Sequence, residues 1–496
     1  MSRLESLPAD VLKLVMQHLS LKDRLTSCCL VSKRLHAAAV AATHQVELRT
    51  DRVQPGLNWM SQYGNCVTNI DLNLFKQPLQ QLPCPNLLEL KLCLCSIQLG
   101  PTADGQPGVV QGCTKLTRLD MRCNLIDAPA GAVVDSLSSL VHLQHLSLLP
   151  RTVEWHDHVF VPAATNSLSI GGLSSETLPR LTCLTYLDVR SLSALNLAQL
   201  GGLTNLKEFS AACLAADEDG FAVSPSSVPG FAFPSSLTKL DLDLNVEAGI
   251  LSLLPDGLKH LHMSECRVEG PAEGPGSMLF YLARLQQLTR LELYLEDDWP
   301  PAGPAYSALT ASGTLAALAV GDATLPTGIW PHVFPSTRQM LHLTHLWFSD
   351  DSVWDATDMS RLVSSCPNLR TLEGLTLEHG LHVSELHKLT AMRSMMVSYA
   401  ADGLEGIGEF AKGMAALTQL QRLVVDLHSQ ELCPVSSLLP LTSLTALTAL
   451  GWGGGLESLL LHSQVSNPTA VCETPVTCAT GSLALGILSL SRAGLS

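Results

Sequence analysis

The sequence predicts an α/β solenoid, in which stacked repeats form a horseshoe with a parallel, concave sheet, preceded by a small all-α module. Two observations support the solenoid. Hexapeptides of the pattern L-x-x-L-x-L recur along the chain, among them "LTRLDM", "LTYLDV", "LTKLDL" and "LTHLWF". The composition is 46% hydrophobic but only 5% aromatic, so the apolar content is aliphatic, as a core of stacked leucines requires.

The spacing of the hexapeptides favours one extended array. Leu288, Leu315, Leu343 and Leu369 follow one another at intervals of 27, 28 and 26 residues, within the period of about 20 to 29 residues of leucine-rich repeats. The chain resembles leucine-rich-repeat proteins over roughly residues 46–450, with about 15 units. The first positions of the units are Val67, Leu87, Leu116, Leu143, Leu184, Leu206, Leu237, Leu258, Leu288, Leu315, Leu343, Leu369, Met392, Leu420 and Leu444.

Two stretches interrupt this array. The 41-residue gap between Leu143 and Leu184 is expected to contain a degenerate unit near "TNSLSI", residues 165–170. Residues 451–496 form an irregular carboxy-terminal segment, in which "LGILSL" at 485–490 is a candidate last repeat. The predicted domains are therefore 1–45, 46–450 and 451–496.

Within each unit the leucines point into a shared core, and the residues between them face outward from the same strand. The outward positions often hold charged pairs two residues apart, such as Arg290 and Glu292. Most of these pairs are expected to be solvated and to contribute little to stability.

Charge and hydropathy exclude several classes of partner. The net charge is −15, and residues 1–50 hold seven basic and four acidic side chains, so the rest of the chain carries −18. Duplex nucleic acid is therefore not an expected ligand. No apolar run approaches the ~18 residues of a membrane span. The amino terminus, "MSRLESLPADVLKLV", places acids and a proline where a secretory signal has its apolar core, which predicts an intracellular protein.

The 15 cysteines are expected to be free thiols packed as small apolar residues. Several lie at or beside repeat positions, for example Cys95, Cys123 and Cys266, and no C-x-x-C pair suggests a zinc site. The best metal candidate is "EWHDH", where Glu154, His156 and His158 share a face if the segment is extended. It has no obvious fourth ligand, so an exposed polar loop is the preferred interpretation and no metal or cofactor is predicted.

Residues 4–43 follow a helical period instead. Ser20 with Asp23 resembles a capping box, and Ser32 is placed to cap a third helix. Three short helices cannot bury all of their apolar surface, so the module should pack against the array or a partner. The apolar positions at helical spacing are Val11, Leu12, Val15 and Leu19, with Leu25, Cys28 and Cys29 continuing a second face.

This module resembles an F-box. The positions that match the family pattern in order are Leu7, Pro8, Val11, Leu12, Val15, Leu19, Leu25, Val31, Ser32 and Lys33, while Leu35 stands where many members have tryptophan. The resemblance implies docking to the Skp-type adaptor of a cullin-RING ubiquitin ligase, with the repeats presenting a protein substrate. The adaptor would be bound by Leu7, Pro8, Val11, Leu12, Val15, Leu19, Leu25 and Val31. The alternative is a helical cap that shields the first repeat.

No nucleophile elbow, HExxH motif or phosphate loop occurs in the sequence, and no catalytic residue is predicted. Three function classes remain open: a non-catalytic ubiquitin-ligase receptor in the cytoplasm or nucleus, a repeat scaffold such as one in a ciliary axoneme, and a hydrolase using the loop at His156. Adaptor binding through residues 4–43 separates the first two classes. Stoichiometric metal would indicate the third.

A substrate site is predicted from two related segments, "LTRLELYLEDDW" and "LTHLWFSDDSVW". Glu296 and Asp351 lie eight residues after the first leucine of each segment, and Trp299 and Trp354 lie eleven residues after it. One rung separates these segments, so they should lie about 10 Å apart.

The residues proposed to capture a basic segment of the substrate by ion pairing and cation–π contact are Asp297, Asp298, Trp299, Asp322, Asp350 and Trp354. The alternative is a set of solvated loops, with a tryptophan plugging one of them.

Overall fold

The computed structural model describes residues 7–19, 23–28, 31–49, 53–73, 82–97, 108–125, 137, 139–148, 181–190, 200–212, 232–267, 278–295, 303–321, 325, 328–348, 354–377, 385–399, 407–427 and 439–453. The chain divides into two compact units, Met1–Leu244 with Leu253–Pro255, and Asn245–Ser252 with Asp256–Ser496. Each unit is described by itself.

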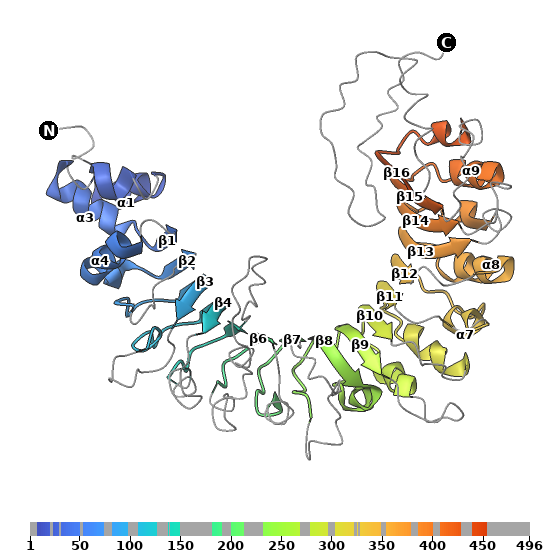
Figure 1. Ribbon diagram of the computed structural model, residues 1–496, viewed down its shortest axis with the longest axis horizontal. Coiled ribbons are helices and arrows are strands. Elements are labelled where there is room, and N and C mark those ends of the chain that lie inside the picture. The colour runs from blue at the N-terminus through green and yellow to red at the C-terminus, as the bar shows by residue number, and fades with distance from the viewer. Residues whose placement is uncertain are drawn as a thin grey trace, which may run out of the picture. The chain divides into compact units, whose positions relative to one another are not determined.

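The first unit begins with the helical module, formed by α1 (Ala9–Gln17), the π-helix η1 (Asp23–Cys28) and α3 (Lys33–Ala41) (Figure 1). The hydroxyl oxygen of Ser32 accepts a hydrogen bond from the Leu35 backbone N–H at 3.2 Å, so the predicted cap of the third helix is confirmed. The core of the module is formed by Leu12, Met16, Leu35, Ala38, Ala39 and Ala42.

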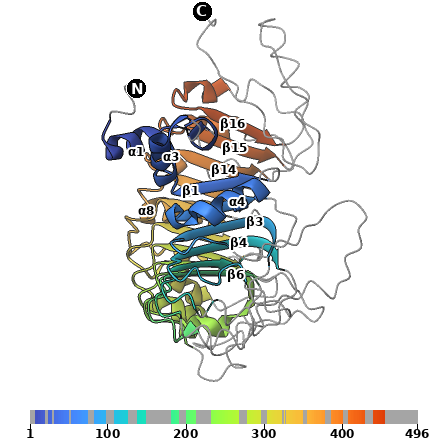
Figure 2. The same ribbon diagram turned by 90° about the vertical axis from the view of Figure 1, so that its left-hand side faces the viewer.

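The sheet of the first unit follows this module. Its strands are β1 (Gln45–Arg49), β2 (Asn69–Asn73), β3 (Glu89–Ile97), β4 (Arg118–Leu125), β5 (His145–Leu148), β6 (Tyr186–Arg190), β7 (Glu208–Ala212) and β8 (Lys239–Glu247). They pair in chain order and all in parallel. Helix α4 (Val53–Tyr63) and the 3-10 helix η2 (Gly64–Cys66) connect β1 to β2 (Figure 2).

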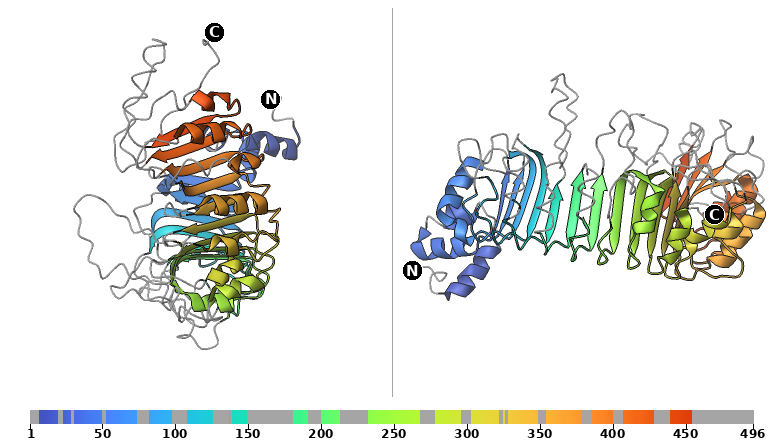
Figure 3. Two further views of the ribbon diagram at one scale, coloured as in Figure 1. Left: turned by 90° about the vertical axis from the view of Figure 1, so that its right-hand side faces the viewer. Right: turned by 90° about the horizontal axis from the view of Figure 1, so that it is seen from below.

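The second unit repeats this arrangement. Its strands are β9 (His260–Arg267), β10 (Arg290–Leu295), β11 (Ala317–Gly321), β12 (His345–Phe348), β13 (Thr371–Leu377), β14 (Ser394–Tyr399), β15 (Arg422–Leu427) and β16 (Ala449–Gly453). The helical segments that connect its rungs are η7 (Ala248–Leu253), η8 (Met278–Arg284), η9 (Gly303–Thr310), α7 (Trp330–Val333), α8 (Ala356–Ser365), α9 (Ile407–Ala415) and η11 (Leu439–Ser443). Figures 1 and 3 show α7, α8 and α9 on one side of the strands. We call the strand face away from these connections the open face.

Alternation along each strand separates core from surface. In β10, Leu291 and Leu293 are 0% and 1% exposed, while Arg290 before them is exposed and Glu292 between them is half-buried. Parallel pairing places Leu291 beside Leu261 on one side and Leu318 on the other. The parallel-stranded leucine-rich-repeat solenoid predicted from the hexapeptides is confirmed.

The hydrogen bonds at the start of each strand explain why the hexapeptides so often begin "LT". Two successive backbone N–H groups donate to one carbonyl of the preceding rung, as Thr289 and Arg290 do to Lys259 at 2.7 and 3.0 Å. The Thr289 hydroxyl donates to the same carbonyl at 3.0 Å. The threonines with this hydroxyl bond are Thr68, Thr117, Thr185, Thr238, Thr289, Thr344 and Thr448.

The pairing of β5 with β6 is direct, from His145↔Tyr186 to Leu148↔Val189. The degenerate unit predicted near "TNSLSI" lies outside the described residues. Strand pairing corrects one assignment made from the sequence. Leu447, and not Leu444, is the first position of its unit, because Arg422 pairs with Ala449 and Leu423 with Leu450. The "LTALTAL" sequence allows both registers, and only the neighbouring strand selects one. Residues 454–496, with the proposed repeat at 485–490, lie outside the described residues.

Among the described residues, no helix is long and apolar enough to cross a membrane.

We predict that Leu291→Asp strongly destabilises the second unit. The carboxylate would replace a fully buried leucine between two leucine-bearing strands. Burying this charge without a partner costs several kcal/mol of stability or raises the pKa of the new carboxyl group. Thermal unfolding checks this, with Gln287→Asp in the exposed preceding turn as the matched control. A melting temperature of Leu291→Asp equal to that of the control would contradict the assigned register.

We also predict that Gly374→Ala lowers the melting temperature by several degrees, because Gly374 has φ +74° and an added Cβ would lie 1.5 Å from the Phe348 carbonyl oxygen. Gly313→Ala is the control, since nothing lies within 4 Å of its added Cβ. Equal melting temperatures for the two variants would show that the bulge between Leu372 and Leu375 in β13 is not as described.

Candidate functional site

The amino-terminal module exposes apolar side chains on α1 and before α3. Val11 is 39% exposed, Leu14 is 58% exposed and Val31 is 67% exposed. Val11 and Leu14 are three residues apart on one helix and therefore lie on the same side of it. Such residues in a small module mark a surface that a partner can cover.

The module is also attached to the first repeat. The His36 Nε2 lies 3.1 Å from the Tyr63 hydroxyl on α4, and the two rings are 5.5 Å apart. Within the module, an Arg24 guanidinium nitrogen donates to the Ala42 carbonyl at the end of α3 at 2.8 Å. The module therefore contacts the array while Val11 and Leu14 stay exposed, so capping and docking are compatible.

The predicted adaptor residues divide into two groups. Leu12 is 0% exposed and lies in the module's own core, so its assignment as an adaptor contact is wrong. Leu7 and Leu19 pack partly buried against that core. The side chain of Leu25 lies outside the described residues. Pro8, Val11 and Val31 are exposed and Val15 is half-buried, so these residues remain candidates. Leu14, which is not part of the family pattern, was not predicted from the sequence but is the most exposed leucine on α1.

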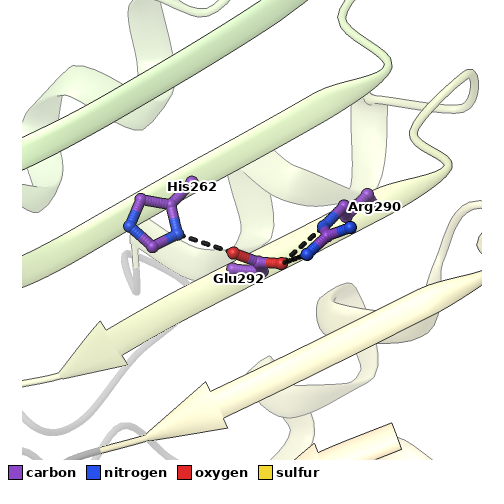
Figure 4. Close-up of polar contacts among 3 residues, drawn as sticks. All are labelled: His262, Arg290 and Glu292. Atoms are coloured by element: carbon purple, nitrogen blue, oxygen red, sulfur yellow. Dashed lines mark hydrogen bonds and ion pairs between the residues drawn. The ribbon is translucent and has the colours of Figure 1, made fainter. Parts of the chain in front are cut away.

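The open face of the second unit contains a polar network that joins β9 and β10 (Figure 4). Nδ1 of His262 lies 2.7 Å from one carboxylate oxygen of Glu292, while the Arg290 guanidinium binds the other oxygen through two nitrogens. Burial opposes ionisation of Glu292, but the bonds from His262 and Arg290 outweigh it and lower the pKa of this carboxyl. The Glu292 side chain is only 19% exposed. Arg290 and Glu292 therefore interact more strongly than the solvated pair expected from the sequence.

Two aromatic side chains extend this network across β11. The Tyr294 ring lies 5.6 Å from the His262 ring and 5.4 Å from the Trp347 ring. Between them, a Cβ added to Gly321 would lie 2.5 Å from Trp347 and 2.7 Å from Tyr294. The missing side chain at Gly321 therefore allows the rings on β10 and β12 to approach each other over β11.

A different cluster occupies the open face of the first unit. The carboxylate of Asp188 accepts hydrogen bonds from the hydroxyls of Ser147 at 3.2 Å and Tyr186 at 3.4 Å. Desolvation nevertheless raises the pKa of Asp188. The ring of His145 stacks on Tyr186 at 4.0 Å, and its burial, together with the nearby positive charge of Arg118, lowers the pKa of His145 to about 4. The Asp188 carboxylate is held by neighbouring hydroxyls and the His145 ring by stacking, so we assign no chemistry to this cluster.

The predicted acidic and aromatic patch is only partly described. Strands β10, β11 and β12 are consecutive neighbours, so the two compared segments do follow strands separated by one rung. The residues of the patch that lie outside the described residues are Asp297, Asp298, Trp299, Asp322 and Asp350.

Trp354 is not at the edge of a surface patch. It is 1% exposed and stacks on Trp330 at 3.8 Å, with Phe348 at 5.4 Å and Phe334 at 5.9 Å. This aromatic cluster fills the core beneath α7 and α8. The assignment of Trp354 to a substrate site is therefore wrong, since equal sequence offset gave no information about which way the side chain turns.

The predicted metal candidates Glu154, His156 and His158 also lie outside the described residues. In the part of the chain that is described, no group of three or more His, Cys, Asp or Glu side chains is arranged to hold a metal ion.

Comparisons with known proteins agree with the amino-terminal assignment. Residues 4–40 match the F-box domain family. No curated protein matches the chain. Among solved structures, an internalin from Listeria monocytogenes strain 4b F2365 matches with 14% identity and a TM-score of 0.39, covering 79% of this chain and 88% of the internalin.

The chain thus contains an F-box domain followed by leucine-rich repeats. This architecture supports a role in protein interaction, and both families are typically non-catalytic adaptors or receptors.

We predict that Glu292→Gln lowers the free energy of unfolding by roughly 1 to 3 kcal/mol at pH 7, because the carboxylate holds two charged or polar donors. The pKa of Glu292 is lowered by folding, so the extra stability of the wild type is present above the unfolded value near ~4.3 and is lost as the pH falls through the folded value. Urea unfolding at pH 7 and at pH 3.5 measures the difference.

The matched control is Glu409→Gln, which removes a 62% exposed partner of Lys412 and should change stability little at either pH. If the difference in free energy of unfolding between the wild type and Glu292→Gln is the same at both pH values, the assigned network is contradicted.

Proposed function

We propose that this protein is the substrate-recognition subunit of a Skp–cullin–F-box ubiquitin ligase. In this proposal the F-box binds a Skp-type adaptor, the adaptor joins a cullin scaffold, and the repeats bind a protein substrate for ubiquitination. The observation that carries the proposal is the F-box match at residues 4–40, directly followed by a parallel repeat sheet that begins at Gln45. F-box domains generally bind Skp-type adaptors.

The exposed apolar residues of the module support the docking step. Val11, Leu14 and Val31 lie outside the module's own core, and each is more than a third exposed. A partner that covers them would remove apolar surface from water, which stabilises a complex by about 25 cal/mol per Å² before the entropy of association is subtracted.

A second candidate function is a repeat scaffold whose helices only cap the solenoid. The contact between His36 and Tyr63 favours it, because this contact joins the module to the first repeat without any partner. The ligase receptor would act in the cytoplasm or nucleus, whereas a scaffold could belong to a ciliary axoneme. Adaptor binding distinguishes the two functions.

We predict that Val11→Asp with Val31→Asp abolishes co-purification of a Skp-type adaptor with the full chain, because each change places a charge on an apolar docking surface. Both sites are exposed, so the melting temperature should stay close to that of the wild type. The control is Gln17→Asp with His18→Asp, two exposed changes at the end of α1. If the wild type recovers no adaptor, or the variant recovers as much as the wild type, the scaffold function is favoured.

A further inference from the structure

Three arginines lie together at the start of consecutive strands in the second unit. Arg370 and Arg393 immediately precede β13 and β14, and Arg422 is the first residue of β15. The Arg393 N–H donates to the Arg370 carbonyl at 2.8 Å, and the Arg422 N–H donates to the Arg393 carbonyl at 2.9 Å. Arg370 and Arg393 hold equivalent positions and are thus separated by a single strand spacing of about 4.8 Å, while Arg422 lies one residue further along its rung and pairs with Ser394.

Arg370 and Arg393 replace the residue that usually occupies this edge. Seven other rungs place threonine at the position of Arg370 and Arg393, with the hydroxyl on the carbonyl of the preceding rung, as Thr344 does on Ala316 at 3.1 Å. Arginine makes no such bond here, and all three side chains are exposed. Two successive rungs therefore lack this local hydrogen bond and carry a positive charge at the surface instead.

The charges of this basic edge are not neutralised within the described part of the chain, where no hydrogen bond or ion pair to a carboxylate is found for Arg370, Arg393 or Arg422. Arg290 on the same unit shows the contrast, since it is bound to Glu292. Exposed guanidinium groups on successive rungs favour an anionic partner, although the chain as a whole carries −15.

An apolar stripe lies beside the basic edge on the open face. Trp347 on β12, Met396 on β14 and Val424 on β15 are all half-buried, and Met396 pairs with Val424 in adjacent strands. Glu373 on β13 lies next to Trp347 and interrupts the stripe. Methionine and aromatic side chains are common where a surface adapts to a partner's apolar groups.

We infer that the open face of β12–β15 binds a segment of the partner protein that carries Asp or Glu side chains beside apolar ones. Its carboxylates would pair with Arg370, Arg393 and Arg422, for which the guanidinium fork is well suited. Its apolar side chains would cover Met396 and Val424. Glu373 requires a hydrogen-bond donor, and not a carboxylate, at that one point.

The open face of the first unit would not bind such a segment. The positions equivalent to the stripe there are mostly acidic, with Glu47, Asp71, Asp120, Asp188 and Asp241 in register across β1 to β8 and Lys91 among them. Carboxylates of the partner segment would be repelled along this row. The segment would therefore bind selectively to the second unit. The segment also has the opposite charge to the basic one predicted from the sequence for residues 297–354.

This inference deepens the proposed function and depends on it only for describing the partner as a substrate. The test is a selection of random 12-residue peptides displayed against the full chain, followed by fluorescence anisotropy with the most enriched peptide. We expect the enriched peptides to combine Asp or Glu with Leu, Met or aromatic residues. A basic or neutral consensus, or no enriched peptide, would overturn the inference.

Paired variants then locate the site. Arg370→Gln with Arg393→Gln should weaken binding of the selected peptide by about tenfold or more, because two charge-assisted contacts are lost. Lys388→Gln with Lys412→Gln removes the same charge from two exposed pairs, in the turn before β14 and on α9, and should leave binding nearly unchanged. Equal weakening in both variants would indicate a response to net charge and would overturn the site.

Two further measurements test the class of partner and its independence from adaptor binding. Single-stranded RNA is added as a competitor, and preferential binding of RNA over the peptide at this edge would overturn the choice of a protein segment. Adaptor co-purification is measured on the same preparations and should be unaffected by the arginine changes. A chain that binds the acidic peptide through Arg370 and Arg393 but recovers no adaptor would refute the ligase function while leaving this inference intact.

Discussion

The turn carbonyl at the start of each rung is the constraint on which the repeat structure depends. This single acceptor receives two backbone N–H groups from the next rung, and often a threonine hydroxyl as well, as the Lys259 carbonyl does from Thr289 and Arg290. The bonds fix both the register and the direction of the following strand. Because each rung exposes leucines that only its neighbours can bury, a slip at one turn would misplace the core residues of every rung packed on it.

The same constraint leaves the open face free to vary. Once backbone bonds and leucines hold the strand, the outward positions can contain any residue that tolerates a pleated surface. In the second unit these positions hold a half-buried ionic network at Glu292, an aromatic pair over Gly321 and a basic edge at Arg370. In the first unit they hold a row of carboxylates. Specificity for a partner can therefore differ between regions of one repeat array without any change in its core.

The F-box module is not one of the repeats but a separate helical module attached to the first of them. Its core is small, and it relies on contacts such as His36 with Tyr63 to join the first repeat. That attachment leaves one apolar side of α1 uncovered. A module that is fixed at one face and open at the other would hold an adaptor and the first rungs in a set relation, which is what a receptor subunit requires.

The sequence by itself determined the repeat fold, the helical module and the cap at Ser32, because these depend on local periodicity and on side chains bonding to nearby backbone. It could not choose between Leu444 and Leu447, because that choice depends on pairing with the neighbouring strand β15.

The orientation of individual side chains was likewise decided only by tertiary structure. Trp354 has the offset of Trp299 but turns into an aromatic core, and Leu12 matches the docking pattern but fills the core of its own module. The sequence order also did not show that Arg370, Arg393 and Arg422 lie on successive rungs. These residues are 23 and 29 positions apart, and only parallel stacking of the rungs brings Arg370 and Arg393 to equivalent positions, with Arg422 one residue further along the next rung.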